Sequence, residues 1–156
     1  MAQANTQQRS KMSAFSRAAM GVQAFLLRRN WLGGMGDFVM VITTTGRKSG
    51  RKISTPIGYL VDGGTYIGLT RSGAERSNWF RNLLHNPNAS LEIRGRKINV
   101  CATQVTDPAE RQAIFELYRA RMGSNFKLMF GIPADAPTAE LQQALADRDF
   151  IRFIPE

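Results

Sequence analysis

Hydrophobic and polar residues alternate in short runs through the middle of the chain, and this pattern predicts strands. The runs with such alternation, or rich in β-branched and aromatic residues, are Phe38–Thr45, Ile53–Val61, Thr65–Thr70, Ser90–Arg94, Lys97–Val105 and Phe150–Ile154. Tight turns at Asp62-Gly63-Gly64 and Arg94-Gly95-Arg96 join neighbouring runs. Strands joined in this way favour an antiparallel barrel or sandwich. We therefore predict an α+β protein with about six mainly antiparallel strands.

Helices are predicted on either side of these runs and between them. A helix over Arg76–His85 interrupts the strands. Asp107 has the character of an N-cap, with Pro108 at the first helical position and Glu110 three residues after the cap, so a helix should start there and continue to Met122. A short helix over Thr138–Asp147 follows.

The amino-terminal region predicts one further helix. Residues 1–11 are polar and rich in Gln, and we expect them to be flexible. Over residues 12–29, five apolar residues recur at spacings of three and four, as in an amphipathic helix: Met12, Phe15, Ala19, Val22 and Leu26. This helix either packs on the domain core, which we favour, or lies on a membrane surface through its cationic flanks. The longest apolar run, Ala24–Leu27, is too short for a signal peptide.

The length of 156 residues fits a single domain, which we place at residues 12–156. Positive charge is concentrated in the first two-thirds of the chain: residues 1–99 hold 15 Lys and Arg against 4 Asp and Glu, whereas residues 100–156 hold 6 against 8. The two parts carry +11 and −2, which give the net +9 of the whole chain. Such a surface attracts a phosphorylated cofactor, an acidic lipid surface or nucleic acid. Nucleic acid is the weakest of the three, because no zinc-finger, basic-zipper or RNP-like pattern is present.

The sequence lacks the residue patterns that several common kinds of enzyme chemistry require. Cys101 is the only cysteine and lies in a strand-like run, so it is predicted to be a buried thiol in a reducing cytoplasm. His85 is the only histidine and is placed at the exposed end of a helix. No metal-ligand spacing and no P-loop are present. Chemistry carried by an organic cofactor is therefore the economical hypothesis for an enzyme.

The stretch Thr43–Pro56 places four cations and two glycines between two predicted strands. Gly46 and Gly50 can supply positive φ or a close backbone approach, Arg47 offers a planar fork, and Lys48 a point charge. These features suit a phosphate or a carboxylate. A solvated basic turn is an equally good interpretation of this stretch alone.

The motifs that follow are more specific. The order is Gly46-Arg47-Lys48-Ser49-Gly50, Thr55-Pro56, a basic Arg71 before Gly73-Ala74, Trp79-Phe80-Arg81-Asn82-Leu83 and Asn86-Pro87. Over residues 39–105 this order resembles the deazaflavin-dependent nitroreductase family of F420H2-dependent oxidoreductases. The resemblance implies a split β-barrel. One departure is Ile53, which stands where family members often have Arg.

The resemblance also implies coenzyme F420, a deazaflavin with a phosphate and an acidic tail, as the hydride donor. By the resemblance, the phosphate would be held by Arg47, Lys48 and Ser49, and Arg71 stands where the family has a basic residue. The ring would be lined through backbone groups by Thr55, Pro56, Ile57 and Gly58. The remaining cofactor-binding positions are a second backbone turn and the helix that closes this side: Ser72, Gly73, Ala74, Trp79 and Asn82. For Trp79, a role as a core anchor is at least as consistent.

The acceptor implied by the resemblance is an activated C=C bond such as an enone, a quinone or a nitro group. An aromatic and methionine stripe would line its pocket or else fill the core: Tyr118, Met122, Phe126, Met129 and Phe130. Thr70, Tyr59, Tyr118 or solvent would supply the proton, and no catalytic residue is assigned.

Two alternatives remain. One is a split-barrel protein that binds FMN or another flavin-like or tetrapyrrole-like ligand. The other is a non-enzymatic basic protein that binds anionic lipid or nucleic acid. The expected location is the cytoplasm, at the inner face of the cell membrane if residues 12–29 bind lipid and the acceptor is lipophilic.

Overall fold

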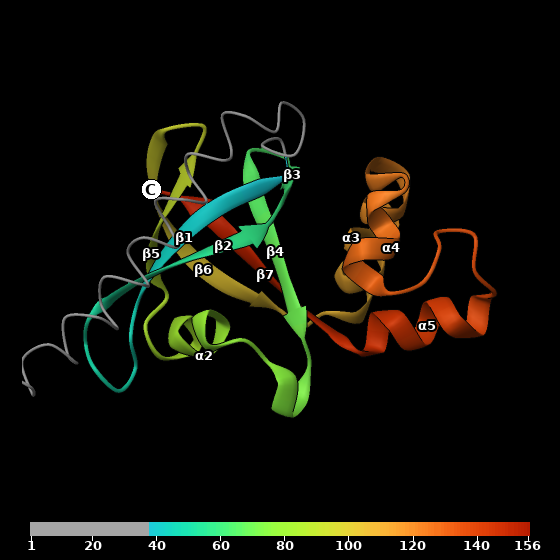
Figure 1. Cartoon of the computed structure of the whole chain (residues 1–156), viewed down its shortest axis with the longest axis horizontal. Coiled ribbons are helices and arrows are strands. Elements are labelled where there is room, and N and C mark those ends of the chain that lie inside the picture. The colour runs from blue at the N-terminus through green and yellow to red at the C-terminus, as the bar shows by residue number, and fades with distance from the viewer. Residues whose placement is uncertain (1–37) are drawn as a thin grey trace, which may run out of the picture.

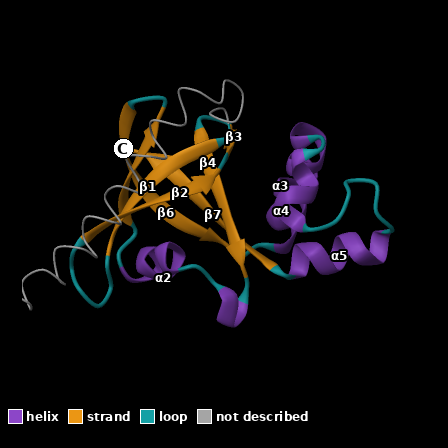
Figure 2. Ribbon diagram, in the orientation of Figure 1, coloured by secondary structure: helices purple, strands orange, loops and turns teal. Residues whose placement is uncertain are grey.

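The computed structural model describes residues 38–156 as a curled antiparallel sheet with helices packed around it (Figures 1 and 2). The strands are β1 (Val39–Thr45), β2 (Lys52–Gly58), β3 (Leu60–Asp62), β4 (Thr65–Arg71), β5 (Asn88–Ile93), β6 (Arg96–Val105) and β7 (Arg148–Pro155). Their order in the sheet is β2-β1-β5-β6-β7-β4-β3, and every neighbouring pair is antiparallel. The predicted α+β class with mainly antiparallel strands is confirmed.

One predicted strand was wrong, and the sheet has seven strands instead of about six. The run Ile53–Val61 forms two strands, because the chain turns away at Tyr59, whose N–H donates to the carbonyl of Phe38. Before that point β2 pairs with β1, and after it β3 pairs with β4 at the other edge of the sheet. The split lets one run of sequence serve both edges of the half-barrel.

The helices agree with the sequence except at one segment. The described helices are α2 (Asn78–His85), α3 (Pro108–Met122), α4 (Asn125–Phe130) and α5 (Thr138–Ala146), with a 3-10 turn at Gly73–Glu75. The carboxylate of Asp107 accepts the N–H of Glu110 at 2.8 Å, which confirms the predicted N-cap. Helix α4 was not predicted, because its six residues are too few to show a helical period.

The core has two parts that lie on opposite faces of the sheet. The barrel interior is filled by residues such as Met40, Ile42, Leu91 and Phe153, and Trp79, Phe80 and Leu83 of α2 close one end of it. The second part lies between the outer face of β4 and β7 and the helices α3, α4 and α5, which gather on one side of the barrel in Figure 1. Each face uses alternate residues of the same strands.

The single cysteine differs from its prediction. Cys101 is half-buried, because it faces outward on β6 while its neighbours Val100 and Ala102 face the barrel interior. The predicted helix over residues 12–29 lies outside the described residues. Within residues 38–156, no helix is both long enough and apolar enough to span a membrane.

Candidate functional site

The turn between β1 and β2 is a closed loop whose two glycines have different roles. The N–H of Gly46 donates to the carbonyl of Arg51 at 2.7 Å, and the N–H of Gly50 donates to the carbonyl of Gly46 at 2.8 Å. Gly50 has φ +68°, which favours glycine. A Cβ added at Gly46 would lie 2.5 Å from Oγ of Ser49 and 3.0 Å from Cδ1 of Ile53. Gly46 therefore meets the close-approach requirement and Gly50 the positive-φ requirement.

Helix α2 holds this turn through Arg47. The backbone N–H and Nη1 of Arg47 both donate to Oδ1 of Asn82, at 3.2 and 3.0 Å, and Nη2 donates to Oδ1 of Asn78 at 3.2 Å. Asn82 is 2% exposed, and its Nδ2 donates to the buried hydroxyl of Thr44 at 3.1 Å. The end of β1 and the turn after it are thus joined to α2, more distant in sequence, through one amide side chain.

A hollow of about 350 Å³ lies between the turn and α2. The turn and the first half of β2 contribute Gly46, Arg47, Lys48, Ser49, Ile53 and Thr55, and α2 contributes Asn78, Trp79 and Asn82. Lys48 is exposed and makes no hydrogen bond or ion pair within the described part of the chain. Its ammonium is therefore available to an anionic ligand, beside apolar surface from Ile53 and Trp79.

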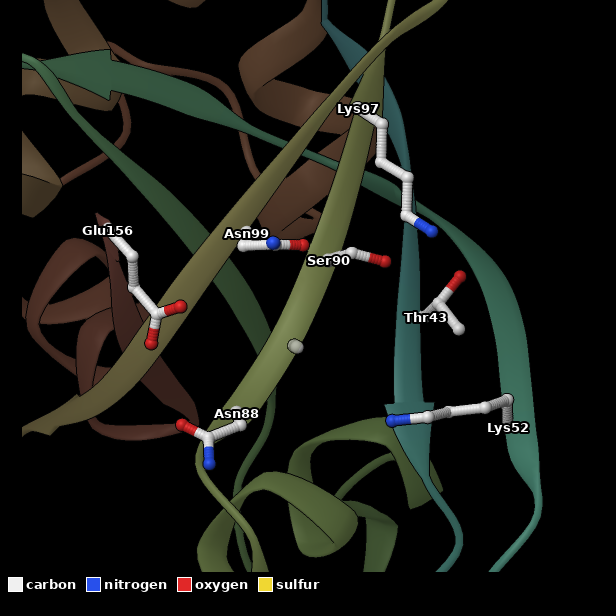
Figure 3. Close-up of a pocket in the computed structure, with 8 residues that line it drawn as sticks. Thr43, Lys52, Asn88, Ser90, Lys97, Asn99 and Glu156 are labelled. Carbon is white, nitrogen blue, oxygen red and sulfur yellow. The ribbon is translucent and has the colours of Figure 1, made fainter.

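Three of the four cations of the stretch line two separate hollows, Arg47 and Lys48 the first and Lys52 the second. Residues of β2 alternate, so Ile53 and Thr55 line the hollow beside α2, whereas Lys52 lines a second hollow on the outer face of the sheet. Figure 3 shows this second hollow, of about 280 Å³, with Lys52 and Lys97 on either side of Thr43 and with Glu156 at the other end. Lys48 and Lys52 carry the same charge on one hairpin but serve different surfaces.

The predicted ring-binding residues lie along β2, which is an edge strand of the sheet. Thr55 lines the first hollow, Pro56 is exposed, and Ile57 points into the barrel core. A Cβ added at Gly58 would lie 3.2 Å from Cε of Met129, so β2 reaches the helical side of the molecule at this residue. An edge strand leaves backbone groups on one side free of strand pairing.

The second predicted turn lies outside the first hollow. The guanidinium of Arg71 is exposed and pairs with Glu75 at 3.0 Å. The N–H of Ser72 donates to the carbonyl of Asp147, and the carbonyl of Ala74 accepts a hydrogen bond from Arg81. Ser72, Gly73 and Ala74 lie in the turn between β4 and α2, and none of them lines the hollow that contains Lys48.

Trp79 packs in the hydrophobic core and also lines the first hollow. It is 6% exposed and packs edge to face on Phe80, with ring centroids 5.6 Å apart, and at a tilt on Phe153. A Cβ added at Gly68 would lie 3.4 Å from Cη2 of Trp79. The indole is therefore a core anchor whose remaining surface lines the hollow.

The proton-donor candidates have other bonding roles. The hydroxyl of Thr70 donates to Oγ of Ser77 at 2.8 Å and accepts the N–H of Ser77 at 2.9 Å. Tyr118 is fully buried, its hydroxyl donates to the carbonyl of Ile67 at 3.3 Å, and burial raises its pKa above the usual value. The ring of Tyr59 is buried in the barrel, with its centroid 6.1 Å from that of Tyr66.

The aromatic and methionine stripe fills the second part of the core. Phe126 and Phe130 stack with centroids 4.5 Å apart, and Tyr118 and Met122 are buried beside them. Met129 is only half-buried and is the stripe residue that reaches β2. The structure thus gives most of the stripe the core role that the sequence left open.

Asn78 was missed by sequence reasoning, although it lines the hollow and binds Arg47. Its spacing of four from Asn82 puts both amides on one helix face, and this spacing was a usable signal. His85 is exposed at the end of α2, as predicted. Among residues 38–156, no group of three or more His, Cys, Asp or Glu side chains could hold a metal ion.

Solved structures share this architecture, which defines the molecule as a split β-barrel of the flavin-binding type. A structure described as an F420-H2 dependent reductase (FDR-A) is 24% identical, with a TM-score of 0.51 over 76% of this chain and 93% of that chain. An FAD-binding protein from Mesorhizobium loti is 12% identical, with a TM-score of 0.51 over 76% and 81%. A putative 5-nitroimidazole antibiotic resistance protein from Bacteroides thetaiotaomicron is 7% identical, with a TM-score of 0.55 over 76% and 72%.

The family follows from the sequence match. The model of the F420H(2)-dependent quinone reductase family matches residues 18–128, so the chain belongs to that family. This confirms the resemblance noted from the hairpin and the motifs after it. It also makes the chain an F420H2-dependent oxidoreductase.

Proposed function

We propose that the hollow between the β1–β2 turn and α2 binds F420, and that the enzyme reduces a quinone, an enone or a nitro compound at the adjoining edge of β2. The observation that carries this proposal is the exposed ammonium of Lys48, which lies beside backbone and apolar surface in a hollow of about 350 Å³. A phosphate next to a planar ring needs this combination of charge and apolar contact.

The residues present fit such a cofactor. Lys48 supplies a point charge, and the glycine at position 46 lets Ser49 and Ile53 lie close to the backbone of the turn. Edge strand β2 offers backbone groups from Thr55 to Gly58, and Pro56 withholds one N–H donor from this edge. When bound in reduced form, F420 supplies a hydride from its ring carbon.

The protein's own contribution is binding and orientation. Lys48 and the turn would fix the phosphate end, the backbone of Thr55–Gly58 would fix the plane of the ring, and Trp79 would exclude water from one side. Arg71 and the turn Ser72–Ala74 are assigned to the distal, acidic part of the cofactor, because they lie away from Lys48. An apolar acceptor would lie near Gly58 and Met129, where β2 meets the helical side.

Solvent is assigned as the proton source. Thr70 and Tyr118 already donate their hydroxyl protons to Ser77 and to the carbonyl of Ile67. Tyr118 also resists ionisation, because burial raises its pKa. A side chain committed in this way would lose a buried hydrogen bond on giving up its proton.

Titration of the full-length protein with F420 and with FMN, followed by ligand fluorescence, tests the proposal. We expect saturable F420 binding and much weaker FMN binding, because the longer acidic part of F420 gains from the positive surface. Tight FMN binding without F420 binding would overturn the choice of cofactor.

A panel of enones, menaquinone analogues and nitroimidazoles, assayed with reduced F420, tests the acceptor. Turnover would be measured as the increase in absorbance of oxidised F420 as F420H2 is consumed. We expect turnover with quinones. A protein that binds F420 but oxidises F420H2 with none of these acceptors would contradict the proposed reaction while leaving the cofactor assignment intact.

A further inference from the structure

The side chain of Asn82 joins α2 both to the β1–β2 turn and to the end of β1. Its Oδ1 accepts both the backbone N–H and Nη1 of Arg47, and its Nδ2 donates to Oγ1 of Thr44. The amide is 2% exposed, and Thr44 is fully buried. Thr44 lies near the end of β1 and Arg47 lies in the turn, so one side chain fixes the helix, the strand and the turn together.

The bonds of Asn82 are difficult to replace. A buried amide that loses its partners carries the full desolvation penalty of the unpaired groups, and so does the buried hydroxyl of Thr44. Water has little access to the hydrogen bond between Asn82 and Thr44, because both side chains are buried. The turn conformation that we describe is therefore energetically coupled to the identity of residue 82.

Arg47 is the arm through which this coupling reaches the turn. Its guanidinium points to Asn82 and Asn78 of α2, whereas Lys48, the next residue, is exposed and has no partner among residues 38–156. The planar fork of arginine presents separate, fixed N–H donors to the two amide oxygens on one helix face, whereas a lysine offers a single point charge. The two adjacent cations of the turn thus have separate tasks.

We infer that Asn82 is a positioning residue that acts through Arg47 to hold the β1–β2 turn in the conformation that presents Lys48 to an anionic ligand. The inference rests on the proposed function for the identity of that ligand, the phosphate of F420. Arg47 belongs to the scaffold of the site, and Lys48 together with the turn backbone makes the direct contact with the ligand. Residue 82 thereby controls cofactor affinity without touching the phosphate.

We call the hydrogen bonds from Asn82 to Arg47 and Thr44 the clamp. Hydrogen exchange of the cofactor-free protein tests the clamp directly. Asn82→Leu keeps the branched shape and the number of heavy atoms of the side chain but removes both the acceptor and the donor, and we expect amides over residues 45–51 to exchange faster by on the order of tenfold or more. Asn82→Asp keeps the acceptor for Arg47 and adds a favourable charge, so it should restore slow exchange. Leu84→Ala, an exposed position on the same helix, is the matched control, and α3 serves as the internal reference.

Binding and kinetics then test the consequence for the site. Asn82→Leu should weaken F420 binding by on the order of tenfold and raise the KM for F420H2, while kcat at saturating cofactor stays close to wild type. A phosphate-free deazaflavin should bind the variant and the wild type equally, because only the phosphate end depends on the turn. Asn82→Asp should recover most of the F420 affinity.

Each outcome decides the inference. Wild-type exchange over residues 45–51 in folded Asn82→Leu would overturn it, and so would equal losses of affinity for F420 and for the phosphate-free ring. If Asn82→Leu does not fold, Arg47→Met replaces it: faster exchange confined to the turn supports the clamp, and unchanged exchange overturns it. If Asn82→Leu shows the predicted faster exchange but the wild-type protein does not bind F420, the clamp is supported and the proposed function is rejected.

Discussion

Arg76 and Asp149 form a partly buried ion pair that joins the loop before α2 to β7, the last strand in the sequence. Nε and Nη2 of Arg76 donate to the same carboxylate oxygen of Asp149, at 2.9 and 2.6 Å. Arg111 of α3 approaches the other oxygen at 3.9 Å. The guanidinium groups also lie over Phe80 and Phe150, so this carboxylate connects both parts of the hydrophobic core.

Asp149→Ala should lower the free energy of unfolding by about 3 kcal/mol, because it leaves two partly buried cations without their counter-ion. Urea denaturation would measure this change. The matched control is Glu75→Ala, which breaks the exposed pair with Arg71, in which both side chains are more than 60% exposed. That pair is screened by solvent, and its loss should cost about 0.5 kcal/mol or less. Equal losses in the two variants would contradict the structural role of Asp149.

Gly68→Ala should destabilise the barrel by about 1–3 kcal/mol through overpacking. The added methyl group would lie 3.1 Å from Cε2 of Phe153, 3.3 Å from Cδ1 of Ile57 and 3.4 Å from Cη2 of Trp79. Thermal denaturation would measure the loss. Ile57→Val removes one of the crowded atoms, so the double variant should be more stable than the sum of the single changes implies. Strict additivity would show that crowding is not the cause.

Lys48→Ala should weaken F420 binding by about 1–3 kcal/mol, the usual scale for a lost charge-assisted hydrogen bond. Lys52→Ala changes the net charge equally but lies on the outer face of the sheet, so it should have a much smaller effect. Fluorescence titration at several salt concentrations would compare the two. Equal weakening would indicate a general electrostatic attraction in place of a defined site.

The buried hydroxyl of Tyr118 should make the folded protein less stable in alkaline solution. Burial raises the pKa of its hydroxyl in the folded state, whereas a tyrosine in the unfolded chain has a pKa of about 10. Above that pH the unfolded chain releases a proton that the folded chain keeps, so the free energy of unfolding falls as pH rises. Urea denaturation at pH 8 and at pH 11 should show a smaller difference for Tyr118→Phe than for wild type.

At pH 8, Tyr118→Phe should cost about 1 kcal/mol, because the carbonyl of Ile67 loses its hydrogen bond from the tyrosine hydroxyl. The mutant would contradict the assignment if its stability fell between pH 8 and pH 11 as steeply as that of the wild type. The other tyrosines are common to both proteins, so the comparison isolates this hydroxyl.

The sequence alone determined the local features of this protein. Alternation along β6 and the N-cap at Asp107 act over a few residues, so they can be recognised without knowledge of distant partners. The hairpin was recognised for the same reason, because Gly46 and Gly50 meet backbone requirements that arise within the turn itself. The family motifs were recognised through their order and spacing.

The tertiary structure decided how those features are used. The break at Tyr59 depends on Phe38, some twenty residues earlier, and on the closure of the sheet, neither of which leaves a local pattern in Ile53–Val61. The separate tasks of Arg47 and Lys48 depend on Asn82 of α2. The separate sites of Lys48 and Lys52 arise because Lys48 lies in the turn beside α2, whereas Lys52 lies on the outer face of β2. Cations that are neighbours in sequence are equivalent by composition, and only packing against other elements gives each one a partner or leaves it free for a ligand.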